Sequence, residues 1–147
     1  MKNLQFLVLK RGFIFIILFV FIAQAETLKV IVTGFKNNNG EAQISLYNKD
    51  GTIPDKNTNQ FYKTKRVIIY NKKAQTIFKN LPKGRYAVSV YHDENNNHKL
   101  DKGFMLPIEG VGLSNFNSMN LFNIPNFKKA SFLLNKDKKI QINIIYL

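Results

Sequence analysis

Hydrophobic and polar residues alternate along most of the chain with a period of two. "TLKVIVTG" (27–34), "EAQISLYN" (41–48) and "RYAVSVYH" (85–92) show the pattern most clearly. Successive side chains of a strand point to opposite faces, so alternation is typical of a strand with one buried face. Weaker versions predict four more strands, "RVIIY" (66–70), "KAQTIFKNL" (73–81), "KASFLLN" (129–135) and "KIQINIIYL" (139–147). Seven short strands are therefore expected.

The predicted strands are separated by turn signals rather than by helical segments. "NNNG" (37–40), "NKDG" (48–51), "LPKG" (81–84) and "NKDKK" (135–139) are rich in residues that favour turns. No window shows a helical stripe of apolar residues. Short strands with hairpin-like punctuation predict an all-β fold, a single antiparallel seven-stranded β-sandwich.

Two segments do not alternate. The first, 52–65, is polar and contains Pro54; the second, 104–127, has two prolines and many phenylalanines and leucines. Structureless loops of this length are uncommon in compact domains and are usually functional. The apolar residues of the second segment indicate that it packs against the sandwich, as a lid folded over one edge.

The N-terminus has the pattern of a secretory signal peptide. Lys2, Lys10 and Arg11 precede the apolar run 13–22, and "AQA" (23–25) is a small-x-small cleavage site. The run is too short to span a bilayer. We expect cleavage after Ala25 and a periplasmic or secreted domain from 26 to 147 that does not span the membrane.

Composition narrows the classes of partner. The chain has 22 basic and 9 acidic residues and no cysteine, so no disulfide supports the exported domain. An excess of positive charge favours anionic partners such as envelope components, and an adhesion module using this basic surface is one interpretation. The lysines are scattered, however, and an arginine-rich groove with stacking aromatics is missing. Nucleic acid is therefore not an expected partner.

The stretch "HDENNNHKLD" (92–101) carries the most specific chemical pattern. Asp93, Asn95, Asn97 and Asp101 have the odd spacing of oxygen ligands in a calcium loop, and the Lys99 carbonyl falls at the position of a backbone ligand. His98 stands where glycine normally makes the sharp turn. The bidentate acid at the end of such loops is missing, so the cage has only two negative charges unless Glu94 or Glu109 joins, and Glu109 could close the shell from outside. The pattern predicts weak calcium binding or, alternatively, a polar turn satisfied by its own hydrogen bonds.

Other chemistry has less support. His92 and His98 lack the thiolate or histidine partners of a transition-metal site, and His92 shares the inward face of its strand. No nucleophile motif surrounds Ser114, so a Ser114–His92 site with Asp93 or Glu109 is not expected. A small envelope enzyme acting on glycans through Asp101 and Glu109 is the alternative to a non-enzymatic binding or structural module, which we expect.

Three stretches carry a family resemblance: "FKNLPKGRYAVSVYHDENNNHKLDKG", "PIEGVGLSN" and "IPNFKKASF". They resemble the exported bacterial domain-of-unknown-function family 2141, whose pattern falls here on Leu81, Pro82, Gly84, Tyr86, Ala87, His92, Asp93, Asn95, Asn97, Leu100, Asp101, Pro107, Glu109, Gly112, Ser114, Asn115, Pro125 and Phe127. His98 replaces a glycine common in the family. The resemblance implies a leader peptide followed by one sandwich, of an immunoglobulin-like or transthyretin-like kind, and implies no activity. We expect Glu109 and Asn115 to lie near the 93–101 loop and to form one recognition face with 104–127.

Overall fold

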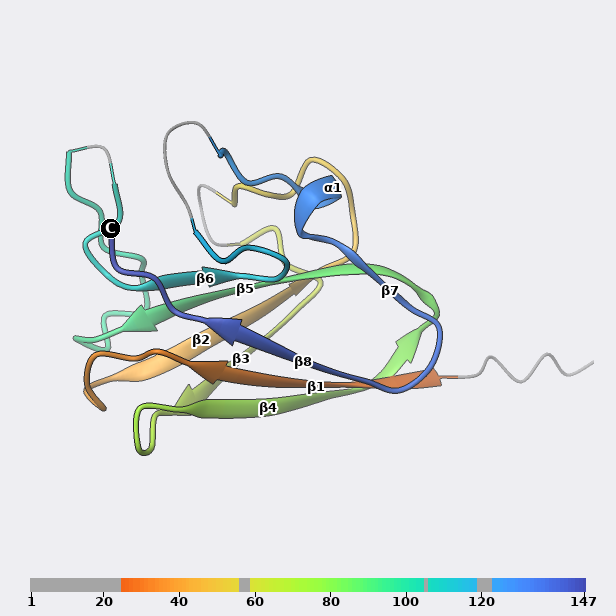
Figure 1. The fold of residues 1–147 in the computed structure, drawn as a ribbon, viewed down its shortest axis with the longest axis horizontal. Coiled ribbons are helices and arrows are strands. Elements are labelled where there is room, and N and C mark those ends of the chain that lie inside the picture. Colours follow the sequence, from red (N-terminus) through yellow and green to blue (C-terminus); the bar gives the residue numbers. More distant parts are fainter. Residues whose placement is uncertain (1–24, 56–58, 105, 119–122) are drawn as a thin grey trace, which may run out of the picture.

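The computed structural model describes residues 25–55, 59–104, 106–118 and 123–147. The predicted signal peptide lies outside the described residues, apart from Ala25. Among the described residues, the regular secondary structure is almost entirely β-strand (Figure 1). Its elements are β1 (Ala25–Thr33), β2 (Glu41–Tyr47), β3 (Lys63–Ile68), β4 (Ala74–Pro82), β5 (Gly84–Asp93), β6 (Val111–Leu113), α1 (Phe127–Ala130), β7 (Phe132–Leu134) and β8 (Lys138–Asn143). No helix among the described residues is long and apolar enough to span a membrane.

The strands form two sheets that share one apolar core. The first sheet has the order β4-β1-β8, and the second has the order β3-β2-β5-β6, with β7 also paired to β5. The alternation correctly predicted the inward faces of the long strands. The core consists of side chains from both sheets, among them Leu28, Val30 and Val32 of β1, Ile44 and Leu46 of β2, and Val88 and Val90 of β5. Burying these side chains stabilises the fold by roughly 1.5–3 kcal/mol for each residue.

The expectation of a purely antiparallel fold was wrong, because β1 and β8 pair in parallel, with Leu28 opposite Lys138 and Thr33 opposite Asn143. The chain leaves β7 on the second sheet and crosses to the first sheet at the end where β1 begins, so β8 runs in the same direction as β1 (Figure 1). The Asp137 carboxylate accepts the Thr27 N–H at 2.7 Å and ties this crossing to β1.

Eight strands form among the described residues, not seven. The additional strand, β6, lies within the 104–127 segment and contains only three residues, too few for alternation to reveal. The predicted strand 129–135 is divided: Ala130 ends the one-turn helix α1, and only 132–134 is extended. Asn126 caps this helix by accepting the Lys129 N–H, which stabilises a helical turn over an extended start.

The two non-alternating segments cover the outer face of the second sheet. A second apolar cluster lies on this face and joins Tyr47 and Ala87 of the sheet to Ile53, Leu113 and Phe116. In Figure 1 the connections after β2 and around β6 lie on the side of β5 away from β1, β4 and β8. The described residues of 104–127 therefore add β6 at the edge of the second sheet and also cover its outer face, and both faces of β2 are buried.

Candidate functional site

Asp93, at the end of β5, organises the backbone of the 93–101 loop. Its side chain is fully buried, and its two carboxylate oxygens accept the N–H groups of Asn97 at 3.0 Å and His98 at 2.8 Å. A carboxylate that accepts backbone N–H groups fixes a turn by charge-assisted hydrogen bonds. Asp93 thus stabilises the turn of the loop through hydrogen bonds to its backbone, which require no bound metal ion.

The other three side chains of the predicted metal loop converge. Asn95 Nδ2 lies 2.7 Å from Asp101 Oδ2, and Asn97 Nδ2 lies 2.9 and 3.0 Å from the two Asp101 oxygens. The amide oxygens of Asn95 and Asn97 accept the N–H groups of Asn97 and Lys99. The spacing therefore predicted which residues meet. In this arrangement their polar groups bond to one another, as in the alternative of a self-satisfied turn.

Glu109 joins this loop from the far side, as expected, but through backbone groups. It is buried, and its two oxygens accept the N–H groups of Glu94 at 2.9 Å and Asp101 at 3.0 Å. Burial raises the pKa of Glu109, although the two N–H groups act to lower it. Both oxygens of Glu109 are occupied in bracing the two ends of the 93–101 loop.

His98 adopts the conformation of the glycine it replaces. Its φ is 64°, in the left-handed region that glycine reaches without steric cost. Histidine is among the non-glycine residues enriched in this region. The backbone therefore turns at His98 in a conformation that favours glycine. The imidazole Nδ1 lies 3.4 Å from Glu41 Oε1 and 3.5 Å from Asp93 Oδ2.

Glu41, Asp93 and His98 form a cluster whose donor atoms lie within 4.8 Å of one another. Arg66 Nε already lies 3.2 Å from Glu41 Oε1, so a cation at this cluster would compete with a guanidinium. Asp93 in turn already accepts two backbone N–H groups. Glu41 Oε1 is buried and accepts no hydrogen bond from the described residues, although Arg66 Nε and His98 Nδ1 lie within ion-pair distance of it.

His92 lies in the core and is hydrogen-bonded at both ring nitrogens. Its Nε2 lies 2.7 Å from the Asn39 carbonyl, and its Nδ1 lies 2.7 Å from the Tyr146 hydroxyl. A carbonyl only accepts, so Nε2 carries the proton, and a neutral ring leaves Nδ1 to accept from Tyr146. The Tyr146 hydroxyl also accepts the Lys36 N–H. His92 therefore links the 35–39 turn, β5 and the C-terminal segment.

Ser114 and Asn115 connect β6 to the segment around α1. Ser114 Oγ accepts the Val88 N–H and donates to the Ala130 carbonyl, so it fills the gap between β6 and β7 along β5. The Asn115 amide donates to the carbonyls of residues 129–131. The expectation that Asn115 joins Glu109 beside the loop was wrong, because its amide is used to hold α1 against β6.

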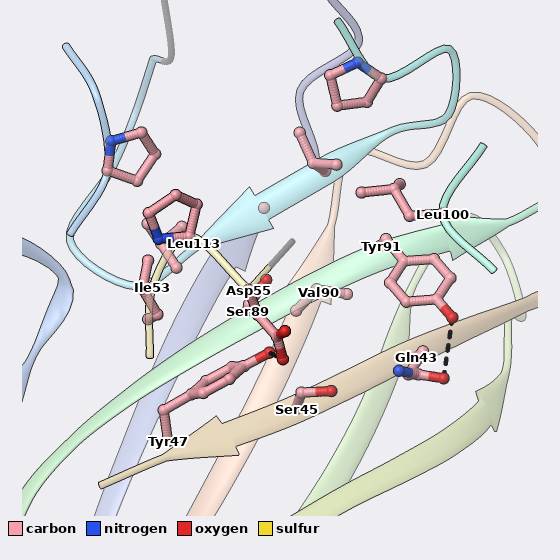
Figure 2. A pocket seen from close by; sticks show the side chains of 15 residues that line it. Gln43, Ser45, Tyr47, Ile53, Asp55, Ser89, Val90, Tyr91, Leu100 and Leu113 are labelled. Atoms are coloured by element: carbon pink, nitrogen blue, oxygen red, sulfur yellow. Dashed lines mark hydrogen bonds between the residues drawn. The ribbon is translucent and has the colours of Figure 1, made fainter. Parts of the chain in front are cut away.

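A pocket that the sequence did not reveal lies on the outer face of the second sheet (Figure 2). It has a volume of about 160 Å³, and its floor is formed by side chains of β2 and β5, among them Gln43, Ser45 and Ser89. Ile53, Leu100 and Leu113 are among the apolar residues around it. The alternation predicts that Gln43, Ser45 and Tyr47 face away from the core. The only indication of a pocket in the sequence was the presence of two long non-alternating segments, 52–65 and 104–127, the second of which was expected to pack against the sandwich.

Asp55 lines the pocket, and one of its carboxylate oxygens is enclosed by protein without a partner among the described residues. Asp55 Oδ2 accepts the Tyr47 hydroxyl at 3.1 Å and the Gln60 N–H at 2.8 Å. Asp55 Oδ1 is buried and receives no hydrogen bond from the part of the chain that the structure describes. Burial, reinforced by Asp55, raises the pKa of Tyr47, so its phenol remains a donor. A buried acceptor left unpaired costs about 1–3 kcal/mol, and such groups require an explanation.

Comparison with protein families agrees with the resemblance seen in the sequence. The model of the family described as "Uncharacterized protein conserved in bacteria (DUF2141)" matches residues 30–143. The matched range includes the last four residues of β1, all of β2 to β8, the 93–101 loop, Glu109 and the pocket. Comparison with the curated proteins and with the solved structures finds no match. This protein belongs to the DUF2141 family of bacterial proteins.

Proposed function

We propose that this protein is an exported, non-enzymatic binding module whose binding site is the pocket on the outer face of β2, β5 and β6. The pocket itself carries the proposal, because Gln43, Ser45 and Ser89 give it a polar floor beneath apolar side chains. Ligand sites are concave and mostly apolar, with a few polar groups that fix orientation, and this pocket has that composition. The signal-peptide pattern of residues 1–25 supports export, so the proposed module would act in the periplasm or outside the cell.

A non-catalytic role is supported by the hydrogen bonds that Glu109 and His92 already make within the protein. Glu109 has both oxygens on backbone N–H groups, and His92 has both nitrogens hydrogen-bonded inside the core. A general acid or base must come within hydrogen-bond reach of its substrate. Glycan hydrolysis through Asp101 and Glu109 would require Glu109 to leave both N–H groups. For this reason we prefer a binding module to a glycan enzyme.

The pocket is tested with ring-sized probes of different charge and with a variant that fills it. We expect at least one of cyclohexanol, benzyl alcohol, tetramethylammonium, acetate and methyl β-glucoside to bind the purified protein, detected by saturation-transfer NMR. Ser89→Leu should abolish the signal, because Ser89 lies on the floor of the pocket. Asp50→Asn, on the exposed turn after β2, is the control and should bind normally. Absence of binding by every probe, or binding undiminished in Ser89→Leu, would contradict the proposal.

Weak calcium binding by the 93–101 loop is a second candidate, favoured by the convergence of Asn95, Asn97 and Asp101. Two carboxylates and two amides give a Kd of about 10⁻⁴–10⁻³ M, as in extracellular modules. Calcium at 10 mM would then stabilise the fold by about 1.4–2.7 kcal/mol, a rise of several degrees in Tm. Thermal melting in 10 mM calcium, in 10 mM magnesium and in chelator measures this rise. A Tm that is equal in calcium and in chelator would eliminate this candidate and leave the self-bonded turn.

A further inference from the structure

We propose that the outer face of the first sheet docks on the surface of an anionic lipid bilayer. We call this surface the basic face and define it by five lysines: Lys29 of β1, Lys63 and Lys65 of β3, Lys79 of β4 and Lys139 of β8. Figure 1 shows β4, β1 and β8 side by side. The pocket lies on the other sheet, so this inference does not depend on the proposed function.

The fold gathers basic residues that are scattered in the sequence. Together, β1, β3, β4, β8 and the turn 69–73 carry nine basic residues and a single acidic residue, Glu26. Glu26 is buried at the start of β1, and its Oε1 lies 3.6 Å from Lys83 Nζ. The ion pairs between described residues include none of the five lysines of the basic face. The positive charge of this face is therefore not neutralised by the part of the chain that the structure describes.

Two lysines of the basic face lie directly beside each other. Lys29 and Lys139 are opposite each other in the parallel pair of β1 and β8, so their backbones are about 4.8 Å apart and their side chains share one side. Leu28 is fully buried, which places Lys29 on the outer side. Asp137, just before β8, already accepts a backbone N–H of β1. Like charges directly opposite destabilise a sheet, and an anionic surface would relieve this repulsion.

Lys63 and Lys65 extend the basic face along the free edge of β4. Lys65 Nζ donates to the Ile77 carbonyl at 2.7 Å. Lys63 Nζ donates to the Lys79 carbonyl at 3.4 Å. These hydrogen bonds hold two positive charges of β3 against the edge strand of the first sheet. An ammonium group has three donors, so each of these lysines can still contact a phosphate.

Apolar side chains adjoin the cations at the turn between β3 and β4. Ile68 is 81% exposed and Tyr70 is 75% exposed. The groove beside them is also lined by Ile31 and Gln75, which are paired on the outer face of the first sheet. In Figure 1 this turn lies at the lower edge of the molecule, at the end of β4. Tyrosine is enriched at membrane–water interfaces, because its ring is apolar and its hydroxyl is polar.

A bilayer fits these features better than a soluble polyanion. Lysine is a compact point charge without a fixed bidentate geometry, so it suits the diffuse charge of many head groups. Proteins that bind single-stranded nucleic acid present several stacking aromatics, whereas here Phe78 is buried and Tyr70 stands alone on these elements. A soluble acidic glycan would leave Ile68 and Tyr70 in water. The interface of a bilayer takes up apolar side chains and offers phosphates to the lysines, each of which strengthens binding about fivefold.

Vesicle cosedimentation tests the inference with the domain 25–147, which contains every described strand and lacks the apolar run 13–22. We expect binding to phosphatidylcholine vesicles that contain about 30% phosphatidylglycerol, at least tenfold tighter than to phosphatidylcholine alone. Raising NaCl from 0.1 to 0.5 M should weaken this binding at least tenfold, because salt screens the lysines. Absence of binding to the anionic vesicles, or equal binding to both kinds, would overturn the inference. Binding of soluble polygalacturonate without vesicle binding would also overturn it.

The triple variant Lys29→Gln, Lys79→Gln, Lys139→Gln should bind the anionic vesicles at least tenfold more weakly, with an unchanged circular dichroism spectrum. The matched control removes the same charge from three exposed lysines outside the basic face: Lys49→Gln, Lys99→Gln and Lys128→Gln. This control should lose less than threefold in affinity. Equal losses in the two triple variants would show that net charge alone drives binding, and would overturn the inference.

The double variant Ile68→Thr, Tyr70→Thr separates a bilayer from a soluble polyanion. Both side chains are exposed, so threonine at these positions removes apolar surface that only the bilayer interface would bury. We expect severalfold weaker binding to the anionic vesicles and a larger loss at 0.5 M NaCl, where the lysines contribute least. Vesicle binding equal to that of the native protein at both salt concentrations would overturn the choice of a bilayer.

Discussion

Gly40→Ala should lower the free energy of unfolding by about 4 kcal/mol or more, a cost reached only by severe steric or burial defects. A Cβ atom on Gly40 would lie 1.8 Å from the Asp93 carbonyl oxygen, and Gly40 has a φ of 63°. The clash cannot be relieved by a side-chain movement, because it is with a backbone atom. In addition, the left-handed conformation costs an alanine about 1–2 kcal/mol. The turn before β2 and the end of β5 would have to separate.

Gly51→Ala is the matched control for this prediction. Gly51 has a φ of 80°, but a Cβ atom added there would meet no atom of the described residues within 4 Å. Only the conformational cost of about 1–2 kcal/mol applies there. Urea unfolding measures the free energy of unfolding of both variants. The difference between their losses gives the cost of the steric clash, because the conformational cost is common to both. Equal losses of stability would show that the 37–40 turn does not press against Asp93 as described.

The close approach at Gly40 matters because the same turn supports the base of the 93–101 loop. The Asn39 carbonyl accepts from His92, and the Asn37 amide and Lys36 ammonium both contact Glu94. Damage at Gly40 would therefore loosen the end of β5. We expect amide hydrogen exchange at Asn97 and His98 to accelerate in Gly40→Ala and to remain slow in Gly51→Ala.

Glu109→Gln should lower the free energy of unfolding by about 2–3 kcal/mol, because hydrogen bonds to charged groups are strong and buried donors are costly to leave unpaired. The carboxylate accepts two N–H groups, from Glu94 and Asp101, whereas a glutamine offers one oxygen and one NH₂ group. One backbone N–H would then face another donor. Urea unfolding at pH 7 measures the loss.

Glu94→Gln is the control for Glu109. Glu94 is more exposed and pairs with Lys36 at 2.7 Å, and such ion pairs contribute up to about 1 kcal/mol.

The pH dependence of stability provides a second test of the role of Glu109. Since burial raises the pKa of Glu109, the native protein gains stability from this group as pH falls through its folded pKa. Glutamine cannot titrate, so the deficit of Glu109→Gln should grow as the pH falls from 7 toward 4.5, the ordinary pKa of a glutamate. A deficit no larger than that of Glu94→Gln would contradict the bracing role.

The all-β class and the buried faces of the long strands were predictable because a two-residue period determines which side chains share a face. Leu28, Val30 and Val32 are all fully buried, as their alternation predicts. Strand direction was not predictable, since alternation is identical in parallel and antiparallel pairs. The β1–β8 pairing depends instead on where the chain crosses between sheets after β7.

The loop of the candidate site was predictable in part, because Asn95, Asn97 and Asp101 lie close together in sequence and their spacing brings them together. The pocket was not, since Gln43, Asp55, Ser89 and Leu113 come from four separate segments. By alternation Gln43 and Ser45 belong on a solvated face, yet both are buried beneath the covering segments. Only the apolar content of 104–127 indicated that a sheet face was covered.

Amide chemical-shift mapping of the ¹⁵N-labelled protein, titrated with the tightest-binding probe of the panel, tests most directly whether the pocket is the binding surface. The account predicts that the largest shifts occur in β2, β5 and β6, at Gln43, Ser89 and Leu113, with Asp55 beside them. It also predicts that residues 95–99 remain unshifted, because their polar groups bond to one another. Shifts centred on residues 95–101, with none in the pocket, would contradict the account.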